Sequence, residues 1–390
     1  MCDHNLFFMK ICIPRKRKMA AHRLLLNHAG VCRFTFTPVR VIGQGFFGTI
    51  QQGEWRVDTA DTAHMADMAH MAHMADMADM ADTVVNTGDA GVATGVGGGA
   101  DAATRPVAIK TVKRRGPEGH HAASQIDKEI EVLRRLANHP FIIKLVAVLQ
   151  SPAAVHLVMQ YCPGGDLFTF VASRMDDEAN RAGFMAQMMF FACEIVVALE
   201  HMHSRFIMHG DIKCENVLID AEGHIRLCDF GLSEVNVRRN SVGGPRGSEL
   251  FMSPEQMTGN SYGLPVDVWA LGYVFINMFT RVNAQRHQMG DAINVNVASV
   301  RNTKVAVAPA MKELIEQLLA VNPRDRPTMA QVKQHAAFAG VEWTAVLSKS
   351  IPVPWRPPVE MCAITFDDAF TTMPVFEIVH DDCTVVTLLN

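Results

Sequence analysis

The sequence has no large excess of charge of one sign and no paired-cysteine motif. Its 36 basic and 40 acidic residues give a formal net charge of −4, so we expect no nucleic-acid or membrane partner. The nine cysteines are odd in number and never spaced as CxxC, which argues against a disulfide framework and favours an intracellular compartment, cytoplasm or nucleus. With 390 residues, the chain is long enough for one large domain or for two to three lobes.

The sequence also lacks a convincing secretory leader or membrane span. The apolar run Leu6 to Ile13 precedes the basic cluster Pro14 to Lys18 instead of following one, so it makes a poor signal peptide. The basic cluster is either a nuclear-import signal or part of a solvated tail. The most membrane-like stretch, Phe184 to His203, contains Gln187 and Glu194, and we therefore expect a buried helix there.

A low-complexity segment separates two parts that have regular patterns. From Asp58 to Asp82 the chain repeats in triplets such as HMA and DMA, and a glycine-rich stretch then runs to Ala100. Three residues advance a helix by about 300°, so the methionines would wind around it and leave no single apolar face. His64, His70 and His73 could bind a transition metal weakly, but we favour a flexible or loosely helical linker.

On both sides of this segment the patterns predict strands first and helices later. Phe36 to Gln52 is typical of two strands around a glycine turn, and PVAIKTV, which begins at Pro106, of a third. Gln125 to Ala137 has apolar residues at helical spacing, and two strand-like runs, FIIKLVAVLQ and AVHLVMQYC, follow it. From Asp166 to about Phe338 we expect mainly helices, and from Ala339 a mostly irregular tail.

Two motifs in the strand-rich part are candidates for binding a phosphate chain, although each alone has another interpretation: a plain hairpin for the glycines and a surface charge for the lysine. GQGFFGTI contains Gly43, Gly45 and Gly48, and glycines let a backbone close over phosphates without obstruction by Cβ atoms. A strand pattern follows these glycines, which disfavours a dinucleotide-binding fold. VAIK ends at Lys110, which could neutralise phosphate charge if an acidic residue holds it in place.

Two further motifs bring acids, a lysine and an amide close together in sequence. MHGDIKCENVLID contains Asp211, Lys213 and Asn216, and CDFG places Asp229 thirteen residues after that asparagine. Each acid alone could be a helix cap or a turn residue. Together the motifs would place a base, a cation and a metal ligand in one loop, which suits catalysis by positioning and charge neutralisation.

In order and spacing, these motifs resemble the eukaryotic protein kinase family over about residues 36 to 338. The resemblance implies an α+β, bilobal fold, with a small β-rich N-lobe that has one main helix and a larger, mostly helical C-lobe. We therefore expect an N-terminal extension over 1–35, an N-lobe over 36–160 with the low-complexity insert at 54–104, a C-lobe over 161–338, and a C-terminal tail over 339–390.

The resemblance implies a role for each polar residue of the two catalytic motifs. Asp211 would accept the proton of the substrate hydroxyl or orient that hydroxyl. Lys213 would contact the transferring phosphate, as in serine/threonine kinases more than in tyrosine kinases. Asn216 and Asp229 would bind Mg²⁺, for which Mn²⁺ could substitute, because hard oxygen ligands suit these ions.

The resemblance also implies an acidic partner for Lys110. Glu129 leads the segment EIEVL, which resembles the family's αC helix, and Leu133 one turn on faces the core on the same side. Asp127 and Glu131 are the alternatives, and both would point elsewhere.

An ATP pocket follows from the same resemblance. Ile50 would pack on the adenine, Leu218 would complete the floor beneath it, and Met159 would be the gatekeeper. The other nucleotide-binding positions that the resemblance implies are Gly43, Gly45, Gly48, Ala108, Lys110, Asp166 at the ribose, and the backbone of Gln160 and Cys162.

Segments farther along the chain extend the resemblance. Ser253-Pro254-Glu255 stands where the family has APE, and Arg326 would be the buried ion-pair partner of its glutamate. DVWALG, which starts at Asp267, resembles the helix that anchors the catalytic loop.

The tail narrows the resemblance to AGC-type serine/threonine kinases. VEWTAVLSKSIPVPWRPPV resembles their tryptophan segment and proline-rich strap, and Phe366, Asp367 and Phe370 match a turn that lies near the nucleotide. VFEIV near Val375 is only a weak candidate for a hydrophobic motif. The alternative is an arbitrary proline-rich tail.

Two residues depart from the family pattern where an activating phosphate is usually held. Gly210 stands where most phosphate-switched kinases have an arginine, and Glu234, five residues past Asp229, stands where a second basic residue is usual. A phosphate on Ser248 would therefore meet repulsion. We expect a kinase that does not depend on activation-loop phosphorylation, with a loop ordered by direct contacts or by a partner, although Ser241 could still be a phosphosite.

The pattern as a whole favours an ATP- and Mg²⁺-dependent serine/threonine protein kinase with protein substrates. A pseudokinase-type binding scaffold is the main alternative, and the intact set of motif residues argues against it. A small-molecule kinase with a related core is a third interpretation. We expect a monomer, and the sequence does not indicate which protein regulates it. After Thr280 the chain lacks the short proline-rich segment that usually leads to the next helix in this family.

Overall fold

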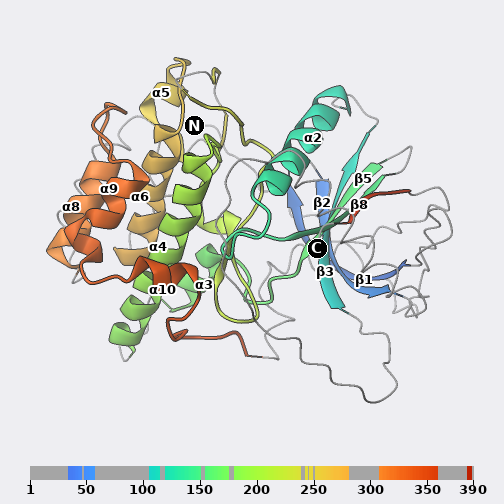
Figure 1. Cartoon of the computed structure of the whole chain (residues 1–390), viewed down its shortest axis with the longest axis horizontal. Coiled ribbons are helices and arrows are strands. Elements are labelled where there is room, and N and C mark those ends of the chain that lie inside the picture. The colour runs from blue at the N-terminus through green and yellow to red at the C-terminus, as the bar shows by residue number, and fades with distance from the viewer. Residues whose placement is uncertain are drawn as a thin grey trace, which may run out of the picture.

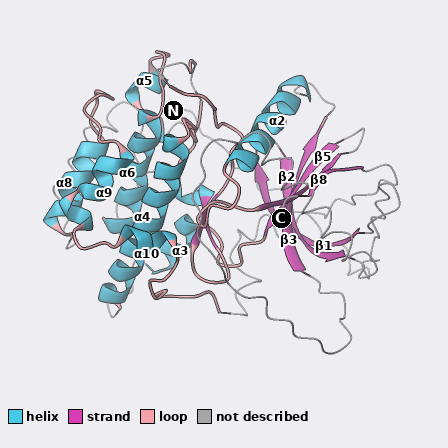
Figure 2. Ribbon diagram, viewed as in Figure 1, coloured by secondary structure: helices cyan, strands magenta, loops and turns pink. Residues whose placement is uncertain are grey.

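Strands and helices occupy two sides of the molecule. The computed structural model of the chain describes residues 34–45, 48–57, 105–114, 119–150, 154–174, 180–238, 242–244, 246–248, 251–280, 307–358 and 384–388. Figures 1 and 2 show the strands gathered on one side with α2 beside them, and the other labelled helices packed together on the opposite side. This arrangement agrees with the expected α+β, two-lobed fold. The expected start of the insert at residue 54 is wrong, because a strand continues to Val57. Residues 58–104 of the expected insert, which include His64, His70 and His73, lie outside the described residues, as do the basic cluster and Ser241.

The larger sheet is antiparallel, and its strands run in space in the order β1-β2-β3-β5-β4-β8. Their bounds are β1 Phe34–Gly45, β2 Gly48–Val57, β3 Arg105–Lys113, β4 Leu145–Gln150, β5 Ala154–Gln160 and β8 Thr384–Leu388. The strands expected from the sequence are confirmed, except that FIIKLVAVLQ becomes regular only at Leu145. The expectation of a mostly irregular tail missed β8, which covers the edge of the sheet at β4.

Helix α2, Gly119–Arg135, contacts β3 of this sheet. Ile126, Ile130 and Leu133 lie three or four residues apart and are all buried, so an apolar stripe of the helix faces the core. The helix begins six residues before Gln125, where the sequence pattern placed its start, because the segment GHHAAS carries no periodic apolar signal.

The helical part is built around two buried helices, α4 and α6. Its helices are α3 Leu167–Arg174, α4 Arg181–Ser204, α5 Pro254–Met257, α6 Pro265–Phe279, α8 Pro309–Leu318, α9 Met329–Gln334 and α10 Trp343–Leu347, with 3-10 turns η2 at Cys214–Asn216 and η5 at Ala336–Phe338. Every residue of α6 from Val266 to Phe279 is buried. A hairpin, β6 Val217–Ile219 with β7 Ile225–Leu227, was not expected, because strands of three residues are too short to show a period.

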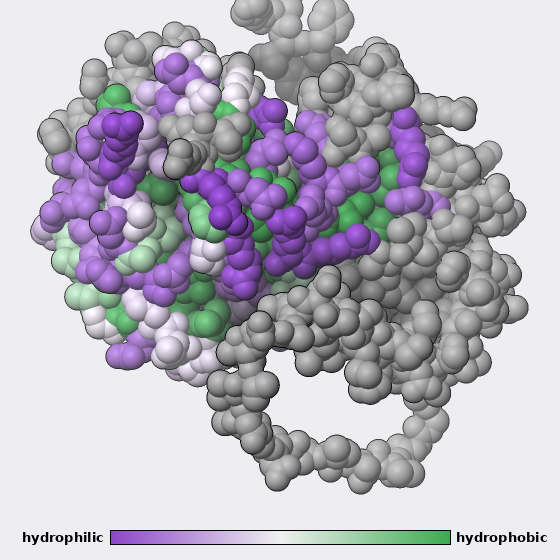
Figure 3. All heavy atoms as spheres, turned by 45° about the horizontal axis from the view of Figure 1, so that its top comes forward, coloured by the Kyte–Doolittle hydropathy of each residue, from purple (hydrophilic) through white to green (hydrophobic). Residues whose placement is uncertain are grey.

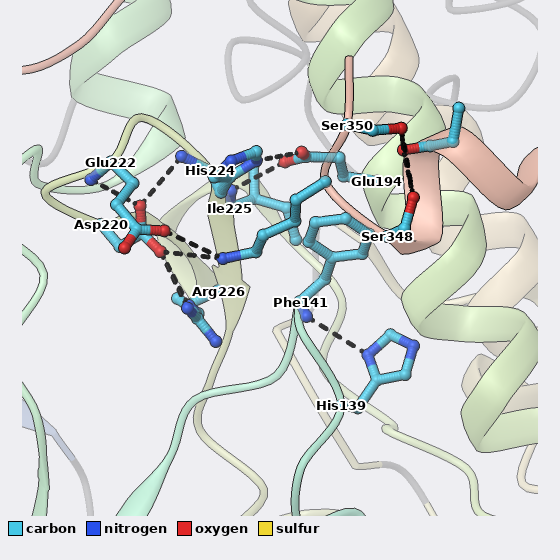
Figure 4. Close-up of polar contacts among 12 residues, drawn as sticks. His139, Phe141, Glu194, Asp220, Glu222, His224, Ile225, Arg226, Ser348 and Ser350 are labelled. Carbon is cyan, nitrogen blue, oxygen red and sulfur yellow. Dashed lines mark hydrogen bonds and ion pairs between the residues drawn. The ribbon is translucent and has the colours of Figure 1, made fainter. Parts of the chain in front are cut away.

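Helix α4 is long and apolar enough to cross a membrane by length and composition, but 67% of that window is buried inside the protein. Its buried Glu194 shares a hydrogen bond of 2.6 Å with Nδ1 of His224 and accepts another of 2.9 Å from the N–H of Ile225 (Figure 4). The expected buried helix is therefore confirmed. On the face that Figure 3 turns to the viewer, hydrophilic residues predominate over the described part, with hydrophobic ones between them.

The first half of the tail packs on the helical part of the molecule. Trp355 meets the ring of Phe170 edge-on at 4.8 Å between centroids, and the guanidinium of Arg174 lies 4.7 Å from the centre of the Trp355 ring. Gly223 has φ +88°, and a Cβ there would collide with the backbone carbonyl of Trp355, so only glycine lets the tail pass this close. Lys349 also pairs with Glu222 at 3.3 Å.

Because β8 lies on the sheet, the tail contacts both parts of the molecule, as the strap-like pattern predicts. The short helix α10 is a further departure from the irregular tail that the sequence indicated. Phe366, Asp367, Phe370 and the segment VFEIV lie outside the described residues.

A buried ion pair joins α5 to the loop before α9. Arg326 NH1 lies 2.6 Å from Oε1 of Glu255, and its NH2 lies 2.8 Å from Oε2. The same guanidinium donates to the carbonyls of Ala320 and Pro265, at 2.8 and 2.9 Å. The expected Glu255–Arg326 pair is confirmed, and its planar, two-bond geometry suits arginine and not lysine.

We predict that Arg326→Met destabilises the protein by about 3–5 kcal/mol, because the carboxylate of Glu255 would keep its buried site and lose its partner. The measurement is the free energy of unfolding in denaturant. Arg324→Met is the matched control, since Arg324 is exposed, and it should change that free energy by about 0.5 kcal/mol or less. Equal effects of the two substitutions would contradict the assignment.

Candidate active site

Lys110 on β3 lies between two carboxylates from distant parts of the chain. Its Nζ is 2.8 and 2.9 Å from the two carboxylate oxygens of Glu129 on α2, and 2.9 Å from Oδ1 of Asp229. Of the candidate acids, Glu129 is therefore the one that reaches the lysine. Asp127 is exposed, and Glu131 pairs with Arg135 within the helix.

The two acids stabilise the protonated form of Lys110, and Lys110 stabilises the ionised form of Asp229. Burial, with a smaller effect of Asp229, raises the pKa of Glu129. Burial alone would lower the pKa of Lys110, but Glu129 and Asp229 outweigh it and raise that pKa well above its ordinary value. Burial would likewise raise the pKa of Asp229, but Lys110 outweighs it and lowers that pKa. The lysine thus stays protonated and Asp229 stays ionised at neutral pH. The backbone of Asp229 lies in the left-handed region, at φ +63°.

Asp211 lies at the centre of a second polar cluster. Its Oδ2 accepts from Nζ of Lys213 at 2.8 Å and from the side-chain amide of Asn216 at 3.1 Å. The same amide nitrogen donates to the backbone carbonyl of Asp211 at 2.8 Å. The three residues named from the motif are therefore brought together, in the loop that ends in the turn η2.

Ser248 also belongs to this second cluster, and the sequence did not predict that it would. Its hydroxyl accepts from Nζ of Lys213 at 2.8 Å, and its backbone N–H donates to Oδ1 of Asp211 at 2.9 Å. The expected repulsion of a phosphate on Ser248 stays a prediction. Ser248 contacts the residues beside Asp211, whereas Glu234 pairs with Lys128 and Arg246.

The buried carboxylate of Asp267, at the start of α6, fixes the backbone before Asp211. It accepts from the N–H groups of His209 and Gly210, both at 2.8 Å, and pairs with Nε2 of His203 at 2.9 Å. Burial would raise the pKa of Asp267, but the His203 bond and the backbone donors lower it, so the carboxylate stays ionised. The expected anchoring of the loop by this helix is confirmed.

Gly210 and Gly247 allow two backbones to meet beside Asp211. Gly210 has φ +80°, and a Cβ there would lie 2.9 Å from the carbonyl oxygen of Leu232. Gly247 has φ +105°, and a Cβ there would lie 2.8 Å from the carbonyl oxygen of Gly210. The missing Cβ of Gly247 thus permits the contact between the loop and the segment before Ser248. The missing Cβ of Gly210, the residue that the sequence singled out as a departure, permits the close approach of the Leu232 carbonyl.

Two of the expected nucleotide positions, Ile50 and Ala108, belong to a small apolar cluster on the sheet. Ala108, Ile42 and Tyr161 are buried together, and the half-buried Ile50 packs against them. Ile42 and Tyr161 were not named from the sequence; Ile42 immediately precedes Gly43, and that adjacency was the available signal. Met159 lies opposite Ala108 on the neighbouring strand and is almost fully buried.

The remaining nucleotide positions lie where the sheet meets the helical part. Gln160 ends β5 and donates its N–H to the carbonyl of Lys144 at 2.9 Å. Asp166 forms an isolated β-bridge with Leu218, which brings these two expected positions together. Both carboxylate oxygens of Asp166 accept bonds from Thr169 at the start of α3, so this acid also caps a helix.

Two more expected positions complete this set. Cys162, whose backbone was expected to meet the nucleotide, lies just after β5 and is buried. Gly45 pairs with Gly48 at the end of the β1–β2 hairpin, and Gly43 pairs with Ile50.

Asp229 and Asn216 supply the oxygen donors that Mg²⁺ prefers. The side chain of Asp229 is 46% exposed although one of its oxygens bonds Lys110, so the carboxylate is accessible to a cation. Because the amide nitrogen of Asn216 donates to Asp211, the amide oxygen is the atom that this residue can offer. The donor set therefore fits a hard cation that keeps water and phosphate oxygens among its ligands.

The arrangement of these clusters is that of a known family. The sequence model for the family described as "Protein kinase domain" matches residues 87–338, which is more than half of the chain. The chain therefore belongs to the protein kinase family, whose members generally use ATP and Mg²⁺.

Three curated relatives are serine/threonine kinases. Ribosomal protein S6 kinase alpha-4 of Mus musculus is 31% identical over 264 residues, which cover 64% of this chain and 33% of the relative. Serine/threonine-protein kinase SCH9 of Candida albicans is 30% identical over 262 residues, 63% of this chain and 32% of the relative. The RAC family serine/threonine-protein kinase homolog of Dictyostelium discoideum is 29% identical over 275 residues, which cover 68% of this chain and 59% of the relative.

The match thus spans from about a third to about three fifths of the length of these relatives. They confirm the AGC-like relationship that the tail indicated.

We predict that Gly210→Ala destabilises the protein more than Gly340→Ala does. Both glycines have φ near +80°, so each substitution carries backbone strain of about 1–3 kcal/mol. A Cβ at Gly340 meets nothing within 4 Å, whereas one at Gly210 meets a carbonyl oxygen. Thermal and denaturant unfolding of the two variants provide the comparison, and a smaller effect at Gly210 would contradict the tight contact.

Proposed function

We propose that the chain transfers the γ-phosphate of ATP to serine or threonine hydroxyls of protein substrates. The observation that carries this proposal is the simultaneous assembly of Lys110–Glu129–Asp229 and of Asp211–Lys213–Asn216. Two lysines, three acids and an amide lie within hydrogen-bonding distance of one another in these two clusters. The serine/threonine kinases among the relatives support the same substrate class.

Each residue has a chemical role in this proposal. Lys110 neutralises charge on the α- and β-phosphates and is held by Glu129, which otherwise would be a buried unpaired acid. Asp211 receives the proton of the attacking hydroxyl or orients that hydroxyl, and Lys213 lies 2.8 Å away to offset charge on the transferring group. Bound Mg²⁺, or Mn²⁺ in its place, would be held by Asp229 and Asn216 and would neutralise the phosphate oxygens.

We further propose that activity does not depend on phosphorylation of the segment between Asp229 and Ser253. The direct contacts seen in this segment support the proposal. Tyr262 donates its hydroxyl to the carbonyl of Gly244 at 2.9 Å, and Val242 and Tyr262 form a β-bridge. Ser248 is bonded to Lys213 and Asp211 without any added group. An intracellular monomer with no membrane or nucleic-acid partner remains our working proposal.

We predict that Asp211→Asn lowers kcat by about 10²–10⁴-fold, because a general base contributes a factor of this size. The assay is transfer of labelled phosphate from ATP to a mixture of serine, threonine and tyrosine peptides. Asp127→Asn is the matched control, since Asp127 is exposed on α2, and it should leave the rate within about threefold of wild type. If wild type transfers no more phosphate than Asp211→Asn, a binding scaffold replaces the enzyme.

We predict that Ser248→Ala lowers kcat by about 5- to 20-fold, whereas Ser248→Thr retains most activity, because threonine keeps the hydroxyl that Lys213 bonds. Intact-mass analysis of the same samples should find no phosphate on Ser248 in active wild type. Ser241→Ala should leave the rate within about threefold of wild type. Loss of all activity in Ser241→Ala, together with phosphate on Ser241 in wild type, would contradict phosphate-independent activity.

A further inference from the structure

Glu234 lies at a junction of three segments that are far apart in sequence. It follows Asp229 by five residues and forms an antiparallel β-bridge with Met208, just before the loop of Asp211. The N–H of Met208 donates to the carbonyl of Glu234 at 2.9 Å, and the N–H of Glu234 donates back at 3.0 Å. This backbone pairing fixes the origin of the Glu234 side chain relative to the catalytic loop.

The carboxylate of Glu234 binds one cation from α2 and another from the segment before Ser248. Nζ of Lys128 lies 2.8 and 3.0 Å from its two oxygens. NH1 of Arg246 donates to Oε1 at 2.5 Å. Glu234 is therefore a bridge between two elements that carry neighbours of the catalytic residues, since Lys128 precedes Glu129 and Arg246 lies two residues before Ser248.

The carboxylate is better shielded from water than its two partners. The side chain of Glu234 is 18% exposed, whereas those of Lys128 and Arg246 are 47% and 43% exposed. Burial alone would raise the pKa of Glu234, but the bonds from Lys128 and Arg246 outweigh it and lower that pKa. The acid is thus ionised at neutral pH, and the bridge carries a fixed negative charge between two positive ones.

Arg246 is also held from the other side. Its backbone carbonyl accepts from Nε2 of Gln256 on α5 at 3.0 Å, and Gly247, next in the chain, packs its backbone against Gly210. A shift of Arg246 would therefore move Gly247 and Ser248. It would also move the Ser248 N–H, which donates a hydrogen bond to Asp211. On the α2 side, a shift of Lys128 would move the turn of helix that presents Glu129 to Lys110.

We propose that Glu234 is a positioning residue whose built-in carboxylate ties α2 to the segment before Ser248, a link that needs no added phosphate. The sequence alone suggested that Glu234 would repel an activating group. In the structure the acid instead attracts two cations, Lys128 from α2 and Arg246 from the segment before Ser248. This role rests on the proposed kinase function, in which Glu234 would keep α2 and the segment before Ser248 in their active positions.

The size of the effect follows from the exposure of the cations. Partly exposed ion pairs contribute modestly, so the two pairs together should change the population of the active arrangement by about 3- to 30-fold. We therefore expect Glu234→Gln to lower kcat by a factor in this range with little change in KM for ATP. Glu234→Lys should lower it further, because the new cation would repel Lys128 and Arg246.

The decisive experiment is a charge exchange. The triple variant Glu234→Lys, Lys128→Glu, Arg246→Glu restores two opposite-charge pairs and should recover most of the kcat lost in Glu234→Lys alone. Glu131→Gln is the matched control, because it removes an ion pair with Arg135 inside α2 that links no second element, and it should leave kcat unchanged. The kcat of wild type should also fall toward that of Glu234→Gln as salt is raised from about 0.05 to about 0.5 M.

A second readout keeps this proposal separate from the kinase function. Amide hydrogen exchange of the peptide containing Gly247 and Ser248 should be faster in Glu234→Gln than in wild type, and should slow again in the triple variant. Exchange and kcat that are the same in Glu234→Gln as in wild type would overturn the role of Glu234 while leaving the kinase intact. If wild type equals Asp211→Asn in transfer, the kinase function fails, and the exchange measurement still decides the link.

Discussion

The structure depends above all on the ammonium of Lys110, which is buried and must be paired. A buried lysine is tolerated only if carboxylates and hydrogen bonds replace its water, and Glu129 and Asp229 do so at 2.8–2.9 Å. Those two acids come from α2 and from the loop after β7, so satisfying one charge fixes the helix, the sheet and the metal-binding loop relative to one another. The same principle recurs at Asp267, whose buried carboxylate is satisfied by the backbone before Asp211.

In the proposed function these charge clusters divide the work of phosphoryl transfer in space. One would hold the nucleotide's phosphates, and the other would hold the hydroxyl that attacks. The backbone contact between Gly210 and Gly247 brings the second cluster together with the segment that ends at Ser248. This contact and the ion pairs of Glu234 are made by residues that are already in the chain.

The sequence predicted those parts of the site whose chemistry dictates residue type at fixed spacing. Asp211, Asn216 and Asp229 belong to that group, and so does the Glu255–Arg326 pair. It failed where no motif marks the partner, as with the bond between Ser248 and Lys213, or where the effect of an acid depends on which cations lie beside it, as with Glu234. Short strands such as β6 and β7 and the tail strand β8 were missed for a related reason. A strand of only a few residues is too short to show an alternating pattern, and the pairing of an edge strand is decided by tertiary contacts.

We propose that the catalytic arrangement forms without a phosphate on the chain. This is tested by the time course of peptide phosphorylation by protein that has been treated with a phosphatase, freed of it and shown by intact mass to carry no phosphate. We expect a linear course from the first turnover, with the segment from Asp229 to Ser253 still unmodified while the rate is constant. A lag that ends only as that segment gains phosphate would contradict it.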